Sequence, residues 1–180
     1  MSRKLVMDNQ SMLFIGQTEG TPIGDLWLAV SERGLVAVED GISQAQFEAW
    51  LVKRFKHTLE YQPKKVAQAA SELQEYLKGR RHHFSLVIDW TLMRPFQQAV
   101  LKATCEIPYG ETRTYKEISE HIGKHHAARA VGRAEATNPM PLIIPCHRVI
   151  GTDGKLHGYG LGEGVKTKEW LLQLEGAIFA

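Results

Sequence analysis

The residues best suited to chemistry stand in the run IIPCHRV, residues 143–149. This run sets Cys146 beside His147 and an arginine, and such neighbours can stabilise a thiolate, the nucleophilic form of cysteine. Pro145 fits the first position of a helix, whose N-terminus would favour the anion further. The run therefore predicts a reactive thiolate at Cys146. The alternative is a buried structural thiol, a common fate of cysteine, which fits Cys105 in the amphipathic run LKATCEI.

Glu175 is a candidate partner for His147. Neighbouring side chains of an extended chain point to opposite faces, so Cys146 and His147 need a turn or a bridging water to interact. Glu175 falls in the last turn of an expected helix, VKTKEWLLQLEGA, where the helix dipole disfavours an anion. A hydrogen bond to the imidazole would explain a carboxylate there, and the alternative is an exposed side chain. The spacing leaves both interpretations open.

A candidate recognition helix precedes this run. TYKE has capping-box spacing, a glycine follows, and HHAARAVGRAEAT is rich in alanine, which together outline a helix-turn-helix. Ala127 and Ala128 leave one side of the second helix smooth, and Arg129 and Arg133 share a face. Residues 121–160 hold five lysines and arginines against two acidic residues, an excess that suits a phosphate backbone. The alternative is a solvated helix whose arginines only confer solubility.

Asn138 stands between this helix and the cysteine. It precedes Pro139, and a residue before proline is disfavoured in helical conformation. Three prolines also exclude a continuous helix through TNPMPLIIPCHRV. We therefore expect Asn138 to be a hinge that carries the chain from the recognition helix to Cys146.

Two units must position these groups. The first alternates strands and helices, with strands expected over residues 11–40 and 84–90 and helices over 43–55 and 66–79. From Phe96 onward the apolar residues recur at helical spacing. We expect a small α/β support domain over residues 1–92 and a mainly helical domain over 93–180.

Composition excludes several classes of protein. The 180 residues carry a net charge of +2 and are 43% hydrophobic and 23% charged, a globular profile. Two cysteines without a CxxC pair are too few for a disulfide framework and fit a reducing, intracellular compartment. MSRKLVMDNQ at the start lacks the apolar core of a signal peptide, and no apolar run reaches the length of a membrane span. The adjacent histidines at 82–83 and 125–126 lack partners at zinc spacing, so no metal is expected.

Several segments, in order, resemble the O6-alkylguanine-DNA alkyltransferases: IPYGETRTY, AARAVGRAEATNP, LIIPCHRVIG, GYG and KEWLLQLEGA. They span about residues 94–177, and PCHRV preceded by RAVG and NP is the most specific part. The resemblance implies a ribonuclease H-like α/β domain with a mainly antiparallel sheet, and a mainly α domain with a winged helix-turn-helix-like motif. It implies a DNA-repair methyltransferase that flips O6-alkylguanine, and O4-alkylthymine, out of duplex DNA and reverses the damage in a single turnover.

The resemblance assigns a catalytic role to four matched positions. It makes Cys146 the alkyl acceptor, which becomes a permanent thioether. His147 takes the thiol proton through a water, and Glu175 holds the imidazole. Asn138 braces the active-site turn. The resemblance implies no cofactor and no metal for this chemistry.

Other matched positions are implied to bind the damaged DNA through its minor groove. Arg129 resembles the finger that enters the stack where the base left, and Tyr115 resembles the tyrosine that crowds the phosphate. Tyr159 resembles the pocket tyrosine that hydrogen-bonds guanine, with backbone groups near Val149 and Gly160 reading the base edge. Further DNA contacts are expected from Ala127, Ala128 and Arg133. The implied partner is double-stranded DNA with O6-alkylguanine, bound by a cytoplasmic monomer, and cooperative binding is left open.

Two departures from the family pattern are visible. The lid GLGEGVKT, residues 160–167, is slightly longer than the family's usual one, and Glu163 adds an anion near the pocket. The range of accepted alkyl groups therefore stays open. No cysteine precedes Cys105, so neither the zinc site of some relatives nor an appended phosphotriester-sensing domain is expected.

Three other functions are alternatives. A non-catalytic protein that binds alkylated DNA lacks the acceptor cysteine, which this chain keeps. A helix-turn-helix regulator leaves PCHR and Glu175 without a purpose. A cysteine hydrolase built on Cys146 and His147 needs turnover and an oxyanion hole, and it gives Arg129 no role.

Overall fold

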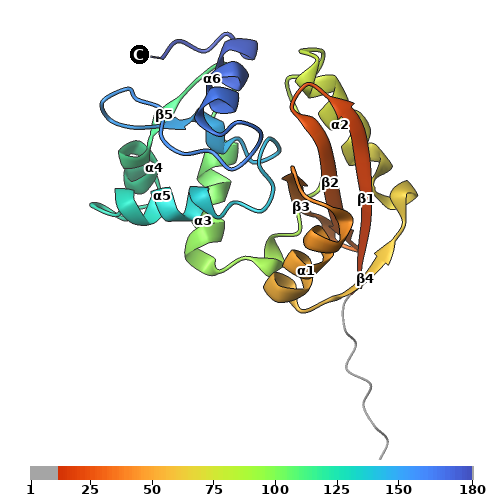
Figure 1. Ribbon diagram of the computed structural model, residues 1–180. Coiled ribbons are helices and arrows are strands. Elements are labelled where there is room, and N and C mark those ends of the chain that lie inside the picture. The colour runs from red at the N-terminus through yellow and green to blue at the C-terminus, as the bar shows by residue number, and fades with distance from the viewer. Residues whose placement is uncertain (1–11, 180) are drawn as a thin grey trace, which may run out of the picture.

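A computed structural model describes residues 12–179, which form a sheet domain followed by a helical domain (Figure 1). The segment MSRKLVMDNQ, which carries the expectation about a signal peptide, lies outside the described residues. Among the helices described, none is long and apolar enough to cross a membrane.

The N-terminal sheet has four strands in the order β3-β2-β1-β4. They are β1 (Met12–Thr21), β2 (Gly24–Ser31), β3 (Gly34–Asp40) and β4 (Thr58–Tyr61). The first three form the antiparallel meander predicted from the sequence, and β4 pairs parallel to β1. Side chains of a strand alternate between the two faces of a sheet, so each face needs its own apolar cover.

One helix covers each face of the sheet (Figure 1). α1 (Gln44–Phe55) begins after the capping residue Ser43 and packs its apolar side against Trp27. α2 (Ala67–Leu77) follows the short helix η1 (Pro63–Val66) and packs against Leu26 and Leu28 on the other face. Both helices lie where the apolar spacing predicted them.

The strand expected over residues 84–90 is wrong. Only Ile88 pairs with the sheet, through a single parallel bridge to Leu35, and the short helix η2 (Trp90–Leu92) follows. Leu35 donates to the carbonyl of Val87 (2.8 Å) and accepts from the amide of Asp89 (2.9 Å). Phe84, Leu86, Ile88 and Trp90 pack against the core while Val87 is 69% exposed, so the alternating pattern reflects one-sided burial of a segment that pairs with β3 only at Leu35.

The C-terminal domain is mainly helical. Its elements are α3 (Pro95–Cys105), β5 (Arg113–Thr114), α4 (Tyr115–His121), α5 (Ala128–Ala136), η3 (Cys146–Arg148), β6 (Val149–Ile150) and α6 (Val165–Leu174). α4 and α5 form the predicted helix-turn-helix, and β5 pairs with β6 beside it. The capping box is present, because Thr114 Oγ1 accepts from the amide of Glu117 (3.1 Å) and Glu117 Oε2 accepts from the amide of Thr114 (2.6 Å).

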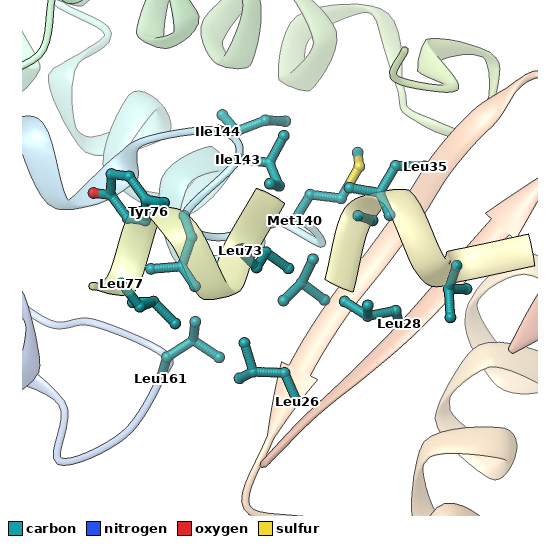
Figure 2. Packing of buried hydrophobic residues seen from close by; sticks show 14 of the residues in the cluster. Leu26, Leu28, Leu35, Leu73, Tyr76, Leu77, Met140, Ile143, Ile144 and Leu161 are labelled. Carbon is teal, nitrogen blue, oxygen red and sulfur yellow. The ribbon is translucent and has the colours of Figure 1, made fainter. Parts of the chain in front are cut away.

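The hydrophobic core of the sheet domain extends into the segment before Cys146 (Figure 2). In this core, Met140 and Ile144 lie beside Leu73 and Tyr76 of α2. The amide of Val38 in β3 also donates to the carbonyl of Pro139, at 2.8 Å. The N-terminal domain therefore holds the chain that carries the cysteine.

Candidate active site

Asn138 closes the segment between α5 and Cys146 into a loop. Its side-chain amide donates to the carbonyl of Ile144 (3.0 Å), and its side-chain oxygen accepts from the amide of Met140 (3.0 Å). A side-chain amide is suited to this position because it both donates and accepts. The loop that bears Cys146 is thereby tied to the end of the recognition helix.

Cys146 lines a cavity of about 770 Å³. Its side chain is 8% exposed, at the point where the loop meets η3. The cavity lies between the helix-turn-helix and the loop after β6, and its size falls within the range of small-molecule pockets, about 300–1,000 Å³. Five more residues predicted for the site share this lining: Tyr115, Ala128, Arg129, Tyr159 and Gly160.

Three of the residues predicted to contact the base or the DNA lie outside this lining. Arg133 is exposed on α5, and Ala127 is half-buried just before that helix. Val149 is fully buried in the helical core, and its carbonyl already accepts from Nζ of Lys168 at 2.6 Å. The side chain of Val149 therefore packs in the core beneath the site, and its carbonyl oxygen is occupied by the hydrogen bond from Lys168.

His147 is fully buried and bonds to Glu175. Its Nε2 lies 2.9 Å from Oε1 of Glu175, and Nε2 carries the proton because its partner there is a carboxylate. The lone pair is then on Nδ1, which has no hydrogen-bond partner among the residues described. The arrangement suits a general base at Nδ1 whose orientation is fixed through Nε2.

Glu175 gathers several further donors. Arg148 donates through Nε to Oε2 (2.8 Å) and through Nη2 to Oε1 (2.9 Å), and the hydroxyl of Tyr76 donates to Oε1 (2.5 Å). The backbone amide of Gly110 reaches Oε2 at 3.2 Å. Burial would raise the pKa of Glu175, but hydrogen bonds from His147 and Arg148 outweigh it and hold the pKa well below its usual value. The carboxylate therefore stays anionic and orients the imidazole without taking its proton.

Burial disfavours the thiolate form of Cys146 in the free protein. Burial raises the pKa of the thiol to about 12, and Glu135 adds to the rise when it is ionised. Pro145 is the residue before a single turn of 3-10 helix, so no α-helix N-terminus stabilises an anion there. Burial also lowers the pKa of His147, which is therefore neutral. The free protein holds a neutral thiol beside a neutral base.

The sequence did not single out three buried polar residues of the site, Tyr76, Glu135 and Lys168, and it noticed Arg148 only as a neighbour of the thiol. Lys168 donates to the carbonyls of Val149 (2.6 Å) and His157 (3.1 Å), so it ties α6 to the loop after β6. Arg148 and Lys168 belong to the runs PCHRV and KEWLL, and their position in these family-like runs could have marked them as residues of the site. Tyr76 lies in the other domain and had no such signal.

Two family models together match most of the chain. The ribonuclease-like domain of 6-O-methylguanine DNA methyltransferase matches residues 18–90, and the DNA binding domain of the same family matches residues 95–177. A methylated-DNA–protein-cysteine methyltransferase of Methanosarcina barkeri is 45% identical over 160 residues, which cover 86% of this chain and 92% of that protein. The chain belongs to the 6-O-methylguanine DNA methyltransferase family.

Other members of the 6-O-methylguanine DNA methyltransferase family agree in sequence and fold. A constitutive methylated-DNA–protein-cysteine methyltransferase of Bacillus subtilis is 38% identical over 158 residues, or 88% of this chain and 93% of that protein. The crystal structure of Mycobacterium tuberculosis OGT in complex with DNA superposes with a TM-score of 0.73 at 38% identity and covers 92% of each chain. The predicted fold is confirmed. The chain is a DNA-repair enzyme of the direct-reversal type, with methylated-DNA–protein-cysteine methyltransferase activity.

Glu135 gives this 6-O-methylguanine DNA methyltransferase a buried carboxyl at the cavity wall. Its Oε1 lies 2.5 Å from Oγ1 of Thr104, and its Oε2 has no hydrogen-bond partner within residues 12–179. The same hydroxyl lies 3.0 Å from the carbonyl of Val100, and its one hydrogen cannot serve both acceptors. A protonated Glu135 that donates to Thr104 removes the conflict. In agreement, burial raises the pKa of Glu135 to about 7.

This raised pKa predicts a pH dependence of stability. A folded-state pKa above the unfolded value of 4.5 stabilises the fold fully below pH 4.5, and the stabilisation is lost as the pH rises through about 7. Glu135→Gln should therefore gain about 2 kcal/mol in unfolding free energy, relative to wild type, between pH 5.5 and pH 8. Urea denaturation at the two pH values measures this gain. Equal pH dependence of the two proteins would show that Glu135 is ionised in the fold.

Proposed function

We propose that Cys146 takes the alkyl group from O6 of a guanine in double-stranded DNA, once per molecule. One observation carries the proposal: the thiol lines a cavity walled by the recognition helix and adjoins the buried His147–Glu175 pair. The cavity receives the flipped base, so the thiol and the base meet where the DNA strand passes α5. No regeneration step is needed for a single turnover.

In the transfer step, Sγ of Cys146 attacks the alkyl carbon. His147 accepts the thiol proton through a water, and anionic Glu175 stabilises the imidazolium that forms. The S–C bond forms as the C–O6 bond breaks, and the electron pair of the broken bond stays on guanine. The guanine anion takes one proton from solvent water and leaves as a neutral base, and the imidazolium returns the thiol proton to the solvent, so the protons balance. The hydroxyl of Tyr159, buried without a partner among the described residues, hydrogen-bonds the departing base.

We propose that the recognition helix enters the minor groove. Arg129 and Arg133 are exposed, and the small side chains of Ala127 and Ala128 permit close approach of a backbone. Arg129 lies at the cavity that holds Cys146, so its guanidinium can fill the stack that the flipped base leaves. Tyr115, at the start of α4, crowds the adjacent phosphate and promotes flipping.

The two domains divide this work in our proposal. Residues 1–92 support the site, and residues 93–180 bind DNA and carry out the transfer. The protein acts inside the cell as a monomer on duplex DNA with O6-alkylguanine, and O4-alkylthymine is a second substrate. Backbone groups at Gly160 read the base edge, and no metal or cofactor takes part.

Mass spectrometry of the protein after reaction with a duplex that carries one O6-methylguanine tests the proposal. We expect one added methyl group per protein, on the peptide that contains Cys146. An unmodified protein that still binds the duplex would contradict the transfer and support lesion binding alone. A methyl group on a different peptide would contradict the assignment of Cys146.

Arg129→Ala should slow methyl transfer from duplex DNA by about tenfold or more, because the flipped state loses the side chain that fills the stack. Transfer from the free base O6-benzylguanine should change little, since no stack is disrupted. The comparison requires rate constants for both substrates, with Arg80→Ala, an exposed arginine of the other domain, as the matched control. Equal losses of rate on both substrates would show that Arg129 acts on the base inside the cavity and not on base flipping.

A further inference from the structure

Tyr76 reaches the active site from the N-terminal domain. It lies in the last turn of α2, is fully buried, and packs its ring against Phe84 at 5.1 Å between centroids (Figure 2 shows it at the edge of the core). Its hydroxyl lies 2.5 Å from Oε1 of Glu175 and 3.1 Å from Nε2 of His147. The side chain therefore contacts both members of the pair that activates the thiol.

The three groups form a closed set of hydrogen bonds. The hydroxyl of Tyr76 has one hydrogen, which points to Oε1 because Glu175 is anionic. The oxygen of Tyr76 then offers a lone pair to Nε2–H of His147, which lies 2.9 Å from Oε1 and 3.1 Å from the hydroxyl. The alternative tautomer, with the proton on Nδ1, would set a lone pair of Nε2 against the carboxylate. The hydroxyl thus has a second contact that keeps the imidazole in one tautomer and one orientation.

We propose that Tyr76 is a positioning residue for alkyl transfer, whose hydroxyl holds the His147–Glu175 pair so that the unpartnered Nδ1 is left to act as the base. The inference rests on the proposed roles of Cys146 and His147. It gives the N-terminal domain a part in the chemistry in addition to support, because the hydroxyl acts across the domain boundary.

Packing alone does not account for the hydroxyl. A phenylalanine would make the same ring contacts with Phe84 and the apolar core. A buried hydroxyl is costly unless it is hydrogen-bonded, and here its only hydrogen-bond partners among the described residues are Glu175 and His147. The hydroxyl of Tyr76 is therefore accounted for by its hydrogen bonds to Glu175 and His147.

The charges around His147 fix the direction of a pH effect. The charged and titratable groups that surround the ring come from α2, η3, the loop after β6 and α6: Tyr76, Cys146, Arg148, Tyr159, Lys168 and Glu175. Removal of the Tyr76 hydroxyl takes a weak neutral acceptor from Nε2–H and a donor from Oε1, and the second effect is the larger because it makes the charged carboxylate a stronger acceptor. The imidazolium is then stabilised, and the pKa of His147 rises. Because neutral His147 is the base, the rate should reach its plateau at higher pH.

Tyr76→Phe tests the proposal, with Tyr61→Phe as the matched control because Tyr61 lies on β4 and is 53% exposed. Transfer rates are measured from pH 5 to 9 with the methylated duplex and with free O6-benzylguanine. We expect Tyr76→Phe to slow both reactions by about tenfold and to move the rising limb of the pH profile up by about half a unit. Duplex binding and the profile of Tyr61→Phe should equal those of wild type.

A His147→Gln background separates positioning from a general loss of structure. If the hydroxyl acts through the imidazole, Tyr76→Phe should cause no further loss of rate once His147 is replaced. A tenfold loss in both backgrounds, or wild-type rates and pH profile for Tyr76→Phe, would overturn the proposal. Wild-type protein that never methylates Cys146 would instead refute the proposed function, so the two failures are distinguishable.

Discussion

Replacing Cys146 by alanine is expected to abolish alkyl transfer and to leave the binding of duplex DNA nearly unchanged. The thiol is the acceptor atom in the proposed step, so no slower route replaces it. Its side chain is small and sits at the cavity wall, which limits the cost of its removal to about 1 kcal/mol of folding stability. Mass spectrometry and a gel-shift titration with the methylated duplex measure the two properties separately.

Cys105→Ala is the matched control, because Cys105 is the other cysteine of the chain and ends α3 outside the cavity lining. It should keep full transfer, at one methyl group per protein. A methyl group still transferred to Cys146→Ala would show that another residue accepts it. Loss of transfer in both variants would point to the fold and not to the acceptor.

The active-site loop could be predicted from the sequence because its signals are local. A residue before proline is disfavoured in helical conformation, and that rule marks Asn138 as a hinge beyond the recognition helix, which ends at Ala136. Glu175 drew notice because a helix C-terminus disfavours a carboxylate. In the structure the unfavourable helix dipole is offset, because two buried side chains, His147 and Arg148, donate hydrogen bonds to the carboxylate of Glu175. Short-range rules thus indicated the positions, although not the full set of partners.

The remaining parts of the site depend on three-dimensional burial, which local rules do not contain. Tyr76 lies 99 residues from Glu175 in the chain, and a tyrosine on a helix is ordinarily read as core. The protonation state of Cys146 could not be predicted for the same reason, because its neighbours in sequence suggest a stabilised thiolate while burial raises the pKa of the thiol. The strand expected over residues 84–90 failed because a period of two does not tell whether a partner strand is present.

Glu175→Gln is expected to lower the free energy of unfolding by about 3–5 kcal/mol at pH 7, the cost of leaving a buried charge without its partner. The guanidinium of Arg148 is buried, and its two bonds to the carboxylate balance its charge. Glutamine keeps the shape of the side chain, but its NH2 group would face the N–H groups of Arg148, and its neutral amide cannot balance the charge of the guanidinium. Urea denaturation measures the change, and Glu163→Gln is the matched control, since Glu163 is exposed and pairs with the exposed Lys166.

The pH dependence of this loss separates the ion pair from packing. The pKa of Glu175 is depressed in the fold, so its stabilisation is complete above the unfolded value of 4.5 and is lost as the pH falls toward the folded-state value. The gap between wild type and Glu175→Gln should therefore be constant from pH 8 to pH 6 and should narrow below about pH 4. A gap that persists unchanged in acid would assign the loss to packing. A gap under about 1 kcal/mol at pH 7, no larger than an exposed pair gives, would show that Arg148 finds another partner when the carboxylate is removed.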